Sequence, residues 1–280
     1  MTIYPNKYNP KLLETVPRKT ARERIGWNSS QIPFAGFDLW NCYELSFLHE
    51  SGLPFVGILQ LKYTVDSEFI VESKSLKLYF NSFNMTKFQS RKEVGKIIER
   101  DLQAILNTPF INIQINPLKS FSQPFTQQNS FNLIDNRESA NNFTYTKDST
   151  LLETIESKSQ KLFYLYSNLL KSNCPITNQP DWGTIYIFYK TDEKEIIPES
   201  LLKYIVSFRN HNEFHEECCE RILFDLKNAL DPKELIVLCK YTRRGGIDIN
   251  PIRMYSKDVN AEKRIPKIFE DILYSRDFRQ

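Results

Sequence analysis

The sequence lacks the glycine-rich loops by which many enzymes hold nucleotide phosphates. Its 280 residues include only eight glycines, and none of them forms G-x-G-x-x-G or G-x-x-x-x-G-K. Any dinucleotide that binds here therefore does so without a Rossmann turn or a P-loop. The sequence also lacks an apolar run near the ~20 residues that cross a bilayer, and its N-terminus has no signal-peptide run. We therefore expect a cytoplasmic protein with no membrane partner.

No excess of one charge sign is present either. The chain has 37 Lys and Arg against 34 Asp and Glu, a net charge of +3. A direct nucleic-acid partner would call for a one-signed cluster, so none is expected. The five cysteines are odd in number and irregularly spaced, which favours free thiols in a reducing compartment over a disulfide framework. The 41% apolar content suffices for a folded core.

Two halves of the chain read alike at an offset of about 126 residues, the signature of an internal repeat. Leu53-Pro-Phe-Val-Gly57 aligns with Gln179-Pro-Asp-Trp-Gly183, and Ser82-Phe83 aligns with Ser207-Phe208. Coincidence among common residue types is the alternative. The shared order of the matches favours a tandem duplication.

Each half also predicts the same elements from its apolar periodicity. A strand, a helix and a strand are expected at 58–63, 91–106 and 110–115, and again at 185–189, 214–230 and 235–241. This order predicts an α+β fold, an antiparallel sheet with helices on one face. We expect an N-terminal module at 1–116, whose first ~35 residues form an arm with little independent structure. A polar connection at 117–150 and a C-terminal module at 151–280 complete the predicted division.

The loop Lys171–Gly183 holds a candidate nucleophile. Cys174 precedes Asp181 by seven residues, and two prolines and a glycine restrict the segment between and after them. A thiol beside a carboxylate has the parts of a nucleophile and its proton partner. In the first half the aligned residues are Leu48 and Phe55, so only one half carries the polar pair. A buried structural cysteine and a turn-capping aspartate are the alternatives.

Two of the three histidines stand in the stretch from His211 to Cys219. If this stretch is helical, His211, His215 and Cys218 or Cys219 share a face and resemble a zinc site. The remaining cysteines lie in predicted strands, so a fourth ligand is lacking and we expect no metal. The other interpretation makes His215 a proton carrier and Glu216 an acceptor for a substrate N–H.

Two further segments have a structural and a functional interpretation. Val71-Glu72-Ser73-Lys74 reads as a strand leading into a helix, with Glu72 and Ser73 near the cap and Lys74 in solvent. Arg243-Arg244-Gly245-Gly246 follows a predicted strand. Paired arginines beside glycines suit a phosphate, and they equally suit a hairpin turn with exposed side chains.

Together these segments resemble the NADPH-dependent 7-cyano-7-deazaguanine reductases, the nitrile reductases of the queuosine tRNA-modification pathway, in their longer two-module form. The matching motifs are Glu72–Tyr79, Ser172–Gly183, Phe208–Glu216 and Tyr241–Gly246 continuing to Pro251, with further likeness at Val16–Arg18 and Leu39–Leu45. The likeness covers most of the chain and is poorest at 117–150.

The resemblance implies two tandem tunnelling-fold (T-fold) modules, a homodimer, and a site divided between the modules. It implies that NADPH reduces the nitrile of 7-cyano-7-deazaguanine through a cysteine thioimide, with no metal or flavin. The implied catalytic residues are Cys174, Asp181 and His215. The implied substrate-binding residues are Val71, Glu72, Ser73, His215 and Glu216, and the implied NADPH-binding residues are Ser73, Lys74, Arg244 and Gly245.

Two other functions stay open from the residues. One is a zinc-dependent cyclohydrolase of the same fold that acts on GTP, which the spacing of His211, His215 and Cys218 would serve. The other is a purine-binding module without catalysis, for which Cys174 would be dispensable.

Overall fold

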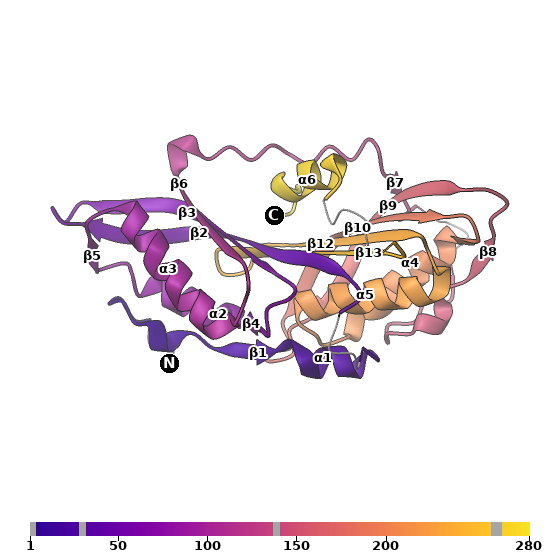
Figure 1. Ribbon diagram of the computed structural model, residues 1–280, viewed down its shortest axis with the longest axis horizontal. Coiled ribbons are helices and arrows are strands. Elements are labelled where there is room, and N and C mark those ends of the chain that lie inside the picture. Colours follow the sequence, from indigo (N-terminus) through magenta and orange to yellow (C-terminus); the bar gives the residue numbers. More distant parts are fainter. Residues whose placement is uncertain (1–3, 28–31, 137–140, 259–264) are drawn as a thin grey trace. The chain divides into compact units, whose positions relative to one another are not determined.

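The structure, a computed structural model, describes residues 4–27, 32–136, 141–258 and 265–280. The chain divides into two compact units. Unit 1 comprises Met1–Asn28, Phe37–Ser122 and Arg243–Ile249, and unit 2 comprises Ser29–Gly36, Gln123–Thr242 and Asn250–Gln280. Figure 1 labels their elements.

Unit 1 is built on a long antiparallel hairpin. Its sheet strands are β2 (Ala35–His49), β3 (Pro54–Thr64), β5 (Lys87–Phe88) and β6 (Ile111–Pro117). β3 pairs antiparallel with β2 and β6, and β5 pairs parallel with β2. The helices are α1 (Arg18–Arg24), α2 (Ser73–Asn81) and α3 (Arg91–Leu106), and the 3₁₀ turns are Pro10–Leu12 and Leu118–Ser120. A separate pair joins β1 (Thr15–Pro17) to β4 (Phe69–Val71).

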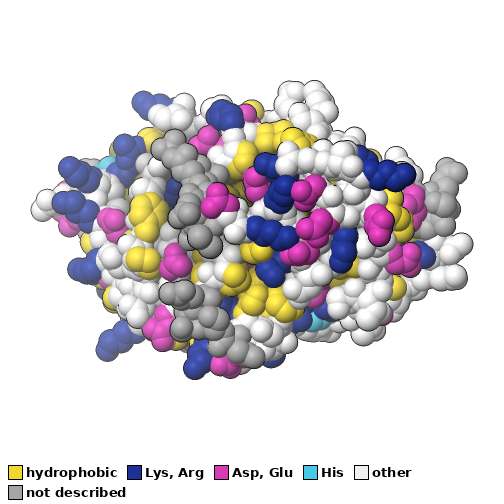
Figure 2. Space-filling view, turned by 45° about the vertical axis from the view of Figure 1, so that its right-hand side comes forward, with side chains coloured by type: hydrophobic (Ala, Val, Ile, Leu, Met, Phe, Trp, Pro, Cys, Tyr) yellow, Lys and Arg dark blue, Asp and Glu magenta, His cyan; other side chains and the backbone are white. Residues whose placement is uncertain are grey.

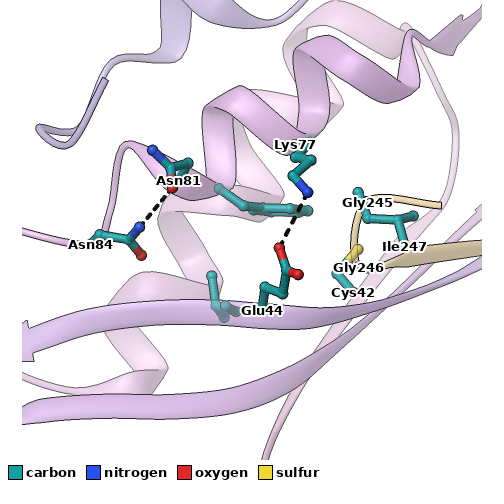
Figure 3. Close-up of a pocket in the computed structure, with 10 residues that line it drawn as sticks. Cys42, Glu44, Lys77, Asn81, Asn84, Gly245, Gly246 and Ile247 are labelled. Atoms are coloured by element: carbon teal, nitrogen blue, oxygen red, sulfur yellow. Dashed lines mark hydrogen bonds and ion pairs between the residues drawn. The ribbon is translucent and has the colours of Figure 1, made fainter. Parts of the chain in front are cut away.

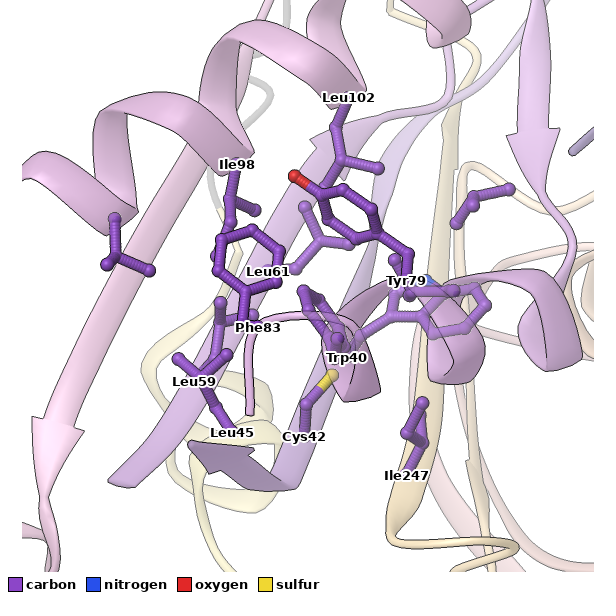
Figure 4. Close-up of a cluster of buried hydrophobic side chains, with 14 of the residues drawn as sticks. Trp40, Cys42, Leu45, Leu59, Leu61, Tyr79, Phe83, Ile98, Leu102 and Ile247 are labelled. Carbon is purple, nitrogen blue, oxygen red and sulfur yellow. The ribbon is translucent and has the colours of Figure 1, made fainter. Parts of the chain in front are cut away.

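The core of unit 1 follows from two periodicities. Alternate residues of β3, among them Leu59 and Leu61, are fully buried, as are Val94, Ile98 and Leu102 at helical spacing on α3. They belong to one cluster (Figure 4). Burying each such side chain contributes about 1.5–3 kcal/mol, so α3 is held by its apolar face.

Unit 2 carries the second long hairpin. Its sheet runs in the order β13 (Ile247–Ser256), β12 (Glu234–Tyr241), β10 (Pro180–Thr191), β9 (Lys161–Asn173), β7 (Asn132–Leu133). The pairings are antiparallel except that of β7 with β9. The helices are α4 (Pro198–Ser207), α5 (His215–Leu230) and α6 (Lys267–Tyr274), with 3₁₀ turns at Ser149–Leu151 and Phe208–Asn210, and β8 (Thr154–Glu156) pairs with β11 (Lys194–Ile196).

The two units repeat one order of elements. β2, β3, β4, α2, α3 and β6 correspond in order to β9, β10, β11, α4, α5 and β12. β2 begins at residue 35 and β9 at 161, 126 residues later, while α3 begins at 91 and α5 at 215, 124 residues later. The prediction that both halves share their element order is therefore confirmed.

The predicted α+β class is confirmed, with one difference. The sheets are mixed rather than wholly antiparallel, because β5 and β7 pair parallel to their neighbours. The described residues of the N-terminal arm form short elements that depend on contacts with the rest of unit 1. Arg18, only 3% exposed, donates to Asp38 at 2.5 Å and to Ser67 at 3.0 Å. A buried charge needs such partners, and they tie the start of α1 to unit 1.

The segment 117–150 has little regular structure in its described residues, and part of it is buried. Within its described residues the regular elements are two short 3₁₀ turns and β7. Phe131 is buried, with ring contacts to Tyr164 and Tyr186.

The surface agrees with the near-neutral charge. On the face that Figure 2 presents, the described Lys and Arg side chains are interspersed with Asp and Glu. Of the helices in the described ranges, none has the length and apolar character needed to span a membrane.

Candidate active site

The Cys174 loop is closed by its own backbone. β9 ends at Asn173 and β10 begins at Pro180. The Cys174 N–H donates to the Gln179 carbonyl at 2.9 Å, and the Asn178 N–H donates to the Cys174 carbonyl at 3.0 Å. The left-handed residue of the loop is Asn178, with a φ of 56°. Asparagine adopts this conformation more readily than most residues, so the reversal is made without glycine.

Gly183 does not belong to this loop, contrary to the sequence interpretation. It lies inside β10, opposite Leu170 of β9 and Tyr241 of β12. The Pro-Asp-Trp-Gly segment reads locally as a turn, but cross-strand pairing on both sides makes it a strand.

The structure brings Asp181 and His215 together within unit 2. Asp181 is the second residue of β10, and His215 is the first residue of α5. The His215 Nε2 lies 3.3 Å from the Asp181 Oδ2. The pairing of Asn173 with Pro180 places Cys174 at the same end of the β9–β10 hairpin as Asp181. All three side chains are buried, at 5%, 6% and 8% exposed for Cys174, Asp181 and His215.

A neighbour without a predicted role completes this group. The Tyr241 ring stacks on the His215 imidazole, with 3.8 Å between centroids and 9° between planes. Tyr241 is fully buried. It was part of a matched motif, but its position on β12 carried no signal of proximity to His215. Glu216 follows His215 in the first turn of α5 and is 2% exposed.

The zinc interpretation fails on local structure. That interpretation required His211 and His215 to share a helical face, and this condition is not met, because α5 begins at His215. His211 instead places its Nε2 3.0 Å from the Glu213 Oε2. In the described part of the chain, no three His, Cys, Asp or Glu residues are grouped so as to hold a metal ion.

Glu213 is the strongest electrostatic feature beside the site. Burial works to raise its pKa, but hydrogen bonds and charge from Arg221 and His211 outweigh burial and hold the pKa at about 2. Its backbone N–H donates to the Asn173 carbonyl at 3.1 Å. The buried carboxylate therefore connects the end of β9, next to Cys174, to Arg221 on α5.

A cation also lies near the site. Lys171 donates through Nζ to the Asn173 Oδ1 and the Arg209 carbonyl, each at 2.6 Å. Burial and the Arg209 charge lower the Lys171 pKa, while the Asp181 carboxyl works in the opposite direction. Lys171 is thus close enough to Asp181 for their charges to interact.

Three of the other four cysteines carry thiols that burial keeps protonated. Burial raises the pKa of Cys42, Cys218 and Cys239 well above the ordinary value. Thiols held neutral in apolar surroundings are unreactive. They serve as packing groups rather than as nucleophiles.

In unit 1 the Glu72 segment adopts its structural interpretation. Glu72 is the N-cap of α2, and its two carboxylate oxygens accept from the N–H groups of Lys74 and Ser75 at 2.9 and 2.6 Å. Val71 is buried at the end of β4, Ser73 is half-buried and Lys74 is exposed. A carboxylate has about four lone-pair positions, so capping leaves capacity for a ligand N–H.

The arginine-glycine segment is a turn in unit 1. Gly245 and Gly246 have φ of +59° and +77°, and a Cβ on Gly246 would approach the Glu44 side chain to 2.4 Å. Only glycine fits both the conformation and the space. The Arg244 N–H donates to the Ile247 carbonyl at 2.8 Å, and the Arg243 guanidinium lies 3.5 Å from the centre of the Tyr43 ring.

This turn borders a pocket of about 120 Å³ (Figure 3). Lys77 of α2 and Glu44 face each other across it, with Nζ and Oε2 3.4 Å apart. The Lys77 Nζ lies 2.9 Å from the place a Gly245 Cβ would occupy. Ser73 and Lys74 stand four and three residues before Lys77, hence on its side of the helix.

The four residues predicted to hold NADPH are therefore all in unit 1, gathered around α2 and the turn. The exposed Lys74 and the half-buried Arg244, beside backbone N–H groups and a glycine, suit a phosphate-bearing ligand. These residues fit such a cofactor without a glycine-rich nucleotide motif.

An α+β fold with a buried thiol at the same end of a hairpin as a carboxylate that pairs with an imidazole defines a candidate thiol-dependent enzyme. Residues 4–115 match the family model described as nitrile reductase, 7-cyano-7-deazaguanine-reductase N-term, and residues 180–260 match that of QueF-like protein. The chain belongs to the family of NADPH-dependent 7-cyano-7-deazaguanine reductases.

Relatives that carry this family name come from three bacteria. That of Saccharophagus degradans is 43% identical over 89% of this chain and 90% of its own. The relative from Colwellia psychrerythraea is 44% identical, and the alignment covers 90% of this chain and 88% of the relative. The relative from Psychrobacter cryohalolentis is 43% identical, and the alignment covers 90% of this chain and 91% of the relative. A solved structure was also compared, the crystal structure of the archaeosine synthase QueF-Like in the apo form. It covers 40% of this chain and 100% of the compared chain, at 21% sequence identity. The TM-score of 0.32 is too low to carry an argument.

Proposed function

We propose that this chain is an NADPH-dependent reductase that converts the nitrile of 7-cyano-7-deazaguanine into the aminomethyl group of 7-aminomethyl-7-deazaguanine, in queuosine biosynthesis. Identity of 43–44% to relatives of that name, over about nine-tenths of the chain, carries the proposal. The grouping of Cys174 with Asp181 and His215 supports it, because these side chains supply a nucleophile and proton carriers.

We propose further that the chain forms tandem T-fold modules at 1–116 and 151–280, joined by 117–150, and that it works as a homodimer. The repeated order of elements in the two units supports the tandem arrangement.

Covalent activation is the proposed role of Cys174. A nitrile accepts hydride poorly, and thiolate attack converts it into a more electrophilic thioimide. The sulfur forms a bond to the nitrile carbon, one C–N π bond breaks, and the nitrogen takes a proton from Asp181. Asp181 is therefore protonated when the nitrile is bound, since an anionic carboxylate would also disfavour the neighbouring thiolate.

Two molecules of NADPH supply the two hydrides that the conversion of a nitrile to an amine requires. Between the two additions the C–S bond breaks and Cys174 leaves as thiolate. The imidazole of His215 delivers a proton to the nitrogen and is recharged through Asp181, to which its Nε2 is adjacent. Proton transfer by a placed group contributes about 10²–10⁴ in rate.

We assign recognition of the deazaguanine ring to hydrogen-bond acceptors of the protein. The N–H edge of the deazaguanine offers donors, and carboxylates are their strongest acceptors. We assign Glu72 and Glu216 to that edge, with Val71, Ser73 and His215 as further substrate contacts. Ser73, Lys74, Arg244 and Gly245 are assigned to NADPH.

The decisive experiment combines intact-protein mass spectrometry with an NADPH oxidation assay. The wild type mixed with the deazaguanine nitrile should gain the mass of one nitrile molecule per chain, and should oxidise NADPH when both are present. Cys174→Ala should do neither. Cys239→Ala, a matched loss of another buried thiol in unit 2, should do both. No adduct and no NADPH oxidation in the wild type would refute the proposal.

A further inference from the structure

The His215 imidazole has a polar side-chain partner at one ring nitrogen and an aromatic ring against its face. Proton-carrying imidazoles are commonly oriented by a hydrogen bond from one ring nitrogen to a carbonyl or carboxylate while the other nitrogen works. Here Nε2 lies 3.3 Å from the Asp181 Oδ2. Nδ1 is buried and has no hydrogen-bond partner among the residues that the structure describes. The ring plane is therefore set by something other than a second hydrogen bond.

Tyr241 supplies the missing constraint. Its ring lies on the imidazole with 3.8 Å between centroids and only 9° between planes. Rotation of the imidazole about its Cβ–Cγ bond would drive it into the phenol ring. The face of Tyr241 thus fixes the plane in which Nε2 faces Asp181, and it leaves Nδ1 without competition from a protein acceptor.

Tyr241 is itself held rigidly. It ends β12, is fully buried, and its carbonyl accepts from the Gln280 Nε2 at 3.0 Å. Its full burial leaves the ring little room to move, because protein interiors are close-packed.

Gly183 makes the space for that ring. It pairs with Tyr241 across the β10–β12 ladder. A Cβ there would lie 3.3 Å from the Tyr241 Cδ1 and 3.2 Å from the Lys240 carbonyl. Its φ lies outside the left-handed range, so the backbone does not require glycine here. The absent side chain serves packing, because it lets the Tyr241 ring settle against the strand.

We propose that Tyr241 is a positioning residue for His215, and that Gly183 is the residue that admits its ring. This rests on the proposed nitrile reductase function. The contribution of Tyr241 comes from the face of its ring rather than from its hydroxyl.

The test uses three variants of the full chain: Tyr241→Phe, Tyr241→Leu and Gly183→Ala. Tyr241→Phe keeps the ring and should retain kcat within about threefold. Tyr241→Leu should lose about 10- to 10³-fold in kcat, a part of the 10²–10⁴ that a placed proton carrier contributes, with the KM for NADPH unchanged. Gly183→Ala, whose Cβ displaces the ring by a few tenths of an ångström, should fall between them.

A spectroscopic readout separates orientation from stability. A ring stacked face-on shields the protons of its neighbour, and the chain has only three histidines. The His215 imidazole proton resonance, assigned by its loss in His215→Gln, should be shielded in the wild type and Tyr241→Phe. It should move toward the free-histidine position in Tyr241→Leu. If Tyr241→Leu does not fold, Gly183→Ala carries the same comparison.

Two results would overturn the inference while the wild type reduces the nitrile normally. One is equal impairment of Tyr241→Phe and Tyr241→Leu, which would assign the effect to the hydroxyl. The other is a displaced His215 resonance with unchanged kcat. A wild type that neither forms the adduct nor oxidises NADPH would instead refute the proposed function.

Discussion

Unit 1 and unit 2 share one order of helices and strands but carry different functional side chains at corresponding positions. At the β9–β10 connection and the start of α5, unit 2 carries Cys174, Asp181 and His215, all buried. At the corresponding places in unit 1, the β2–β3 turn and the start of α3, stand Leu48, Phe55 and Arg91. The reverse holds at the N-cap of the preceding helix, which is Glu72 for α2 in unit 1 and the apolar Ile197 for α4 in unit 2.

The difference teaches that the framework and the chemistry are separable. Sheet and helix are held in both units by apolar side chains at the strand and helix periods, which tolerate exchange of the residues at hairpin ends and helix starts. Such positions can therefore carry a nucleophile and a proton carrier in one unit and ordinary turn residues in the other.

The largest effect is expected from a mutation that disrupts the Asp181–His215 pair of unit 2. Asp181→Asn keeps the size of the side chain but removes the acid, so kcat should fall by about 10²–10⁴. Steady-state NADPH oxidation measures it. The aligned change in unit 1, Phe55→Leu, should leave kcat within about twofold. Similar losses in both variants would contradict the assignment of the acid to unit 2.

The protonation of Asp181 has its own test. If the bound state needs a protonated Asp181, the rate of adduct formation should show a falling limb as pH rises. Stopped-flow measurement of the adduct across pH gives the profile. A rate that climbs steadily to high pH would oppose the assignment.

The next effect concerns Glu213, whose aligned residue in unit 1 is Gln89, 124 residues earlier. Its pKa of about 2 lies below its ordinary value of 4.5, so its contribution to stability is fully present above pH 4.5. It is lost as pH falls from 4.5 to 2. At neutral pH, Glu213→Gln should lower the free energy of unfolding by about 3 kcal/mol.

Urea denaturation at several pH values measures this. The gap between wild type and Glu213→Gln should close toward pH 2. Asp192→Asn is the control, because Asp192 forms a solvent-exposed ion pair with Lys233, and such pairs contribute little. If Asp192→Asn lowered the free energy of unfolding as much as Glu213→Gln, the buried Glu213 carboxylate would have no special role in stability.

A smaller effect separates the two roles of Glu72. Glu72→Gln keeps one acceptor oxygen for the cap of α2 but removes the charge. Hydrogen bonds to charged groups are worth about 1.5–3 kcal/mol, so the KM for the nitrile should rise by about 10- to 150-fold. The melting temperature should fall only slightly. A KM that does not change would leave Glu72 as a helix cap alone.

The smallest effect is expected from the loss of another helix cap in unit 1, which serves as the control for Glu72. Ser90 caps α3 through its hydroxyl, which accepts from the Glu93 N–H at 3.1 Å. Ser90→Ala should cost about 1 kcal/mol and leave both KM values unchanged. Thermal unfolding and steady-state kinetics report the two quantities. A change in KM would mean that cap loss alone disturbs the site, and the Glu72 result would need that correction.

Local patterns were sufficient for much of the fold. The helix at 91–106 was predicted with the bounds that the structure shows, and that at 214–230 was off by one residue. Apolar periodicity reports which face of an element is buried, and a long strongly periodic segment leaves little ambiguity. The α+β class and the shared order of elements followed from it.

Local patterns failed where partners distant in sequence decide the conformation. The structure of the N-terminal segment depends on Asp38, Ser67 and β4, which no local pattern of residues 4–27 reveals. Gly183 reads as a turn residue and is a strand residue, because β9 and β12 pair with β10 on both sides. The contact of His211 with Glu213, just before α5, likewise follows from the folded structure rather than from a local pattern.

The sequence by itself determined the types of element, their repeated order and the residues able to carry nitrile chemistry, since these depend on side-chain type and spacing. Only the tertiary structure decided that His215 faces Asp181, that Tyr241 lies against its imidazole, and that Glu72 caps α2. Distances between residues far apart in the chain are set by packing of whole elements, and spacing along the sequence does not encode them.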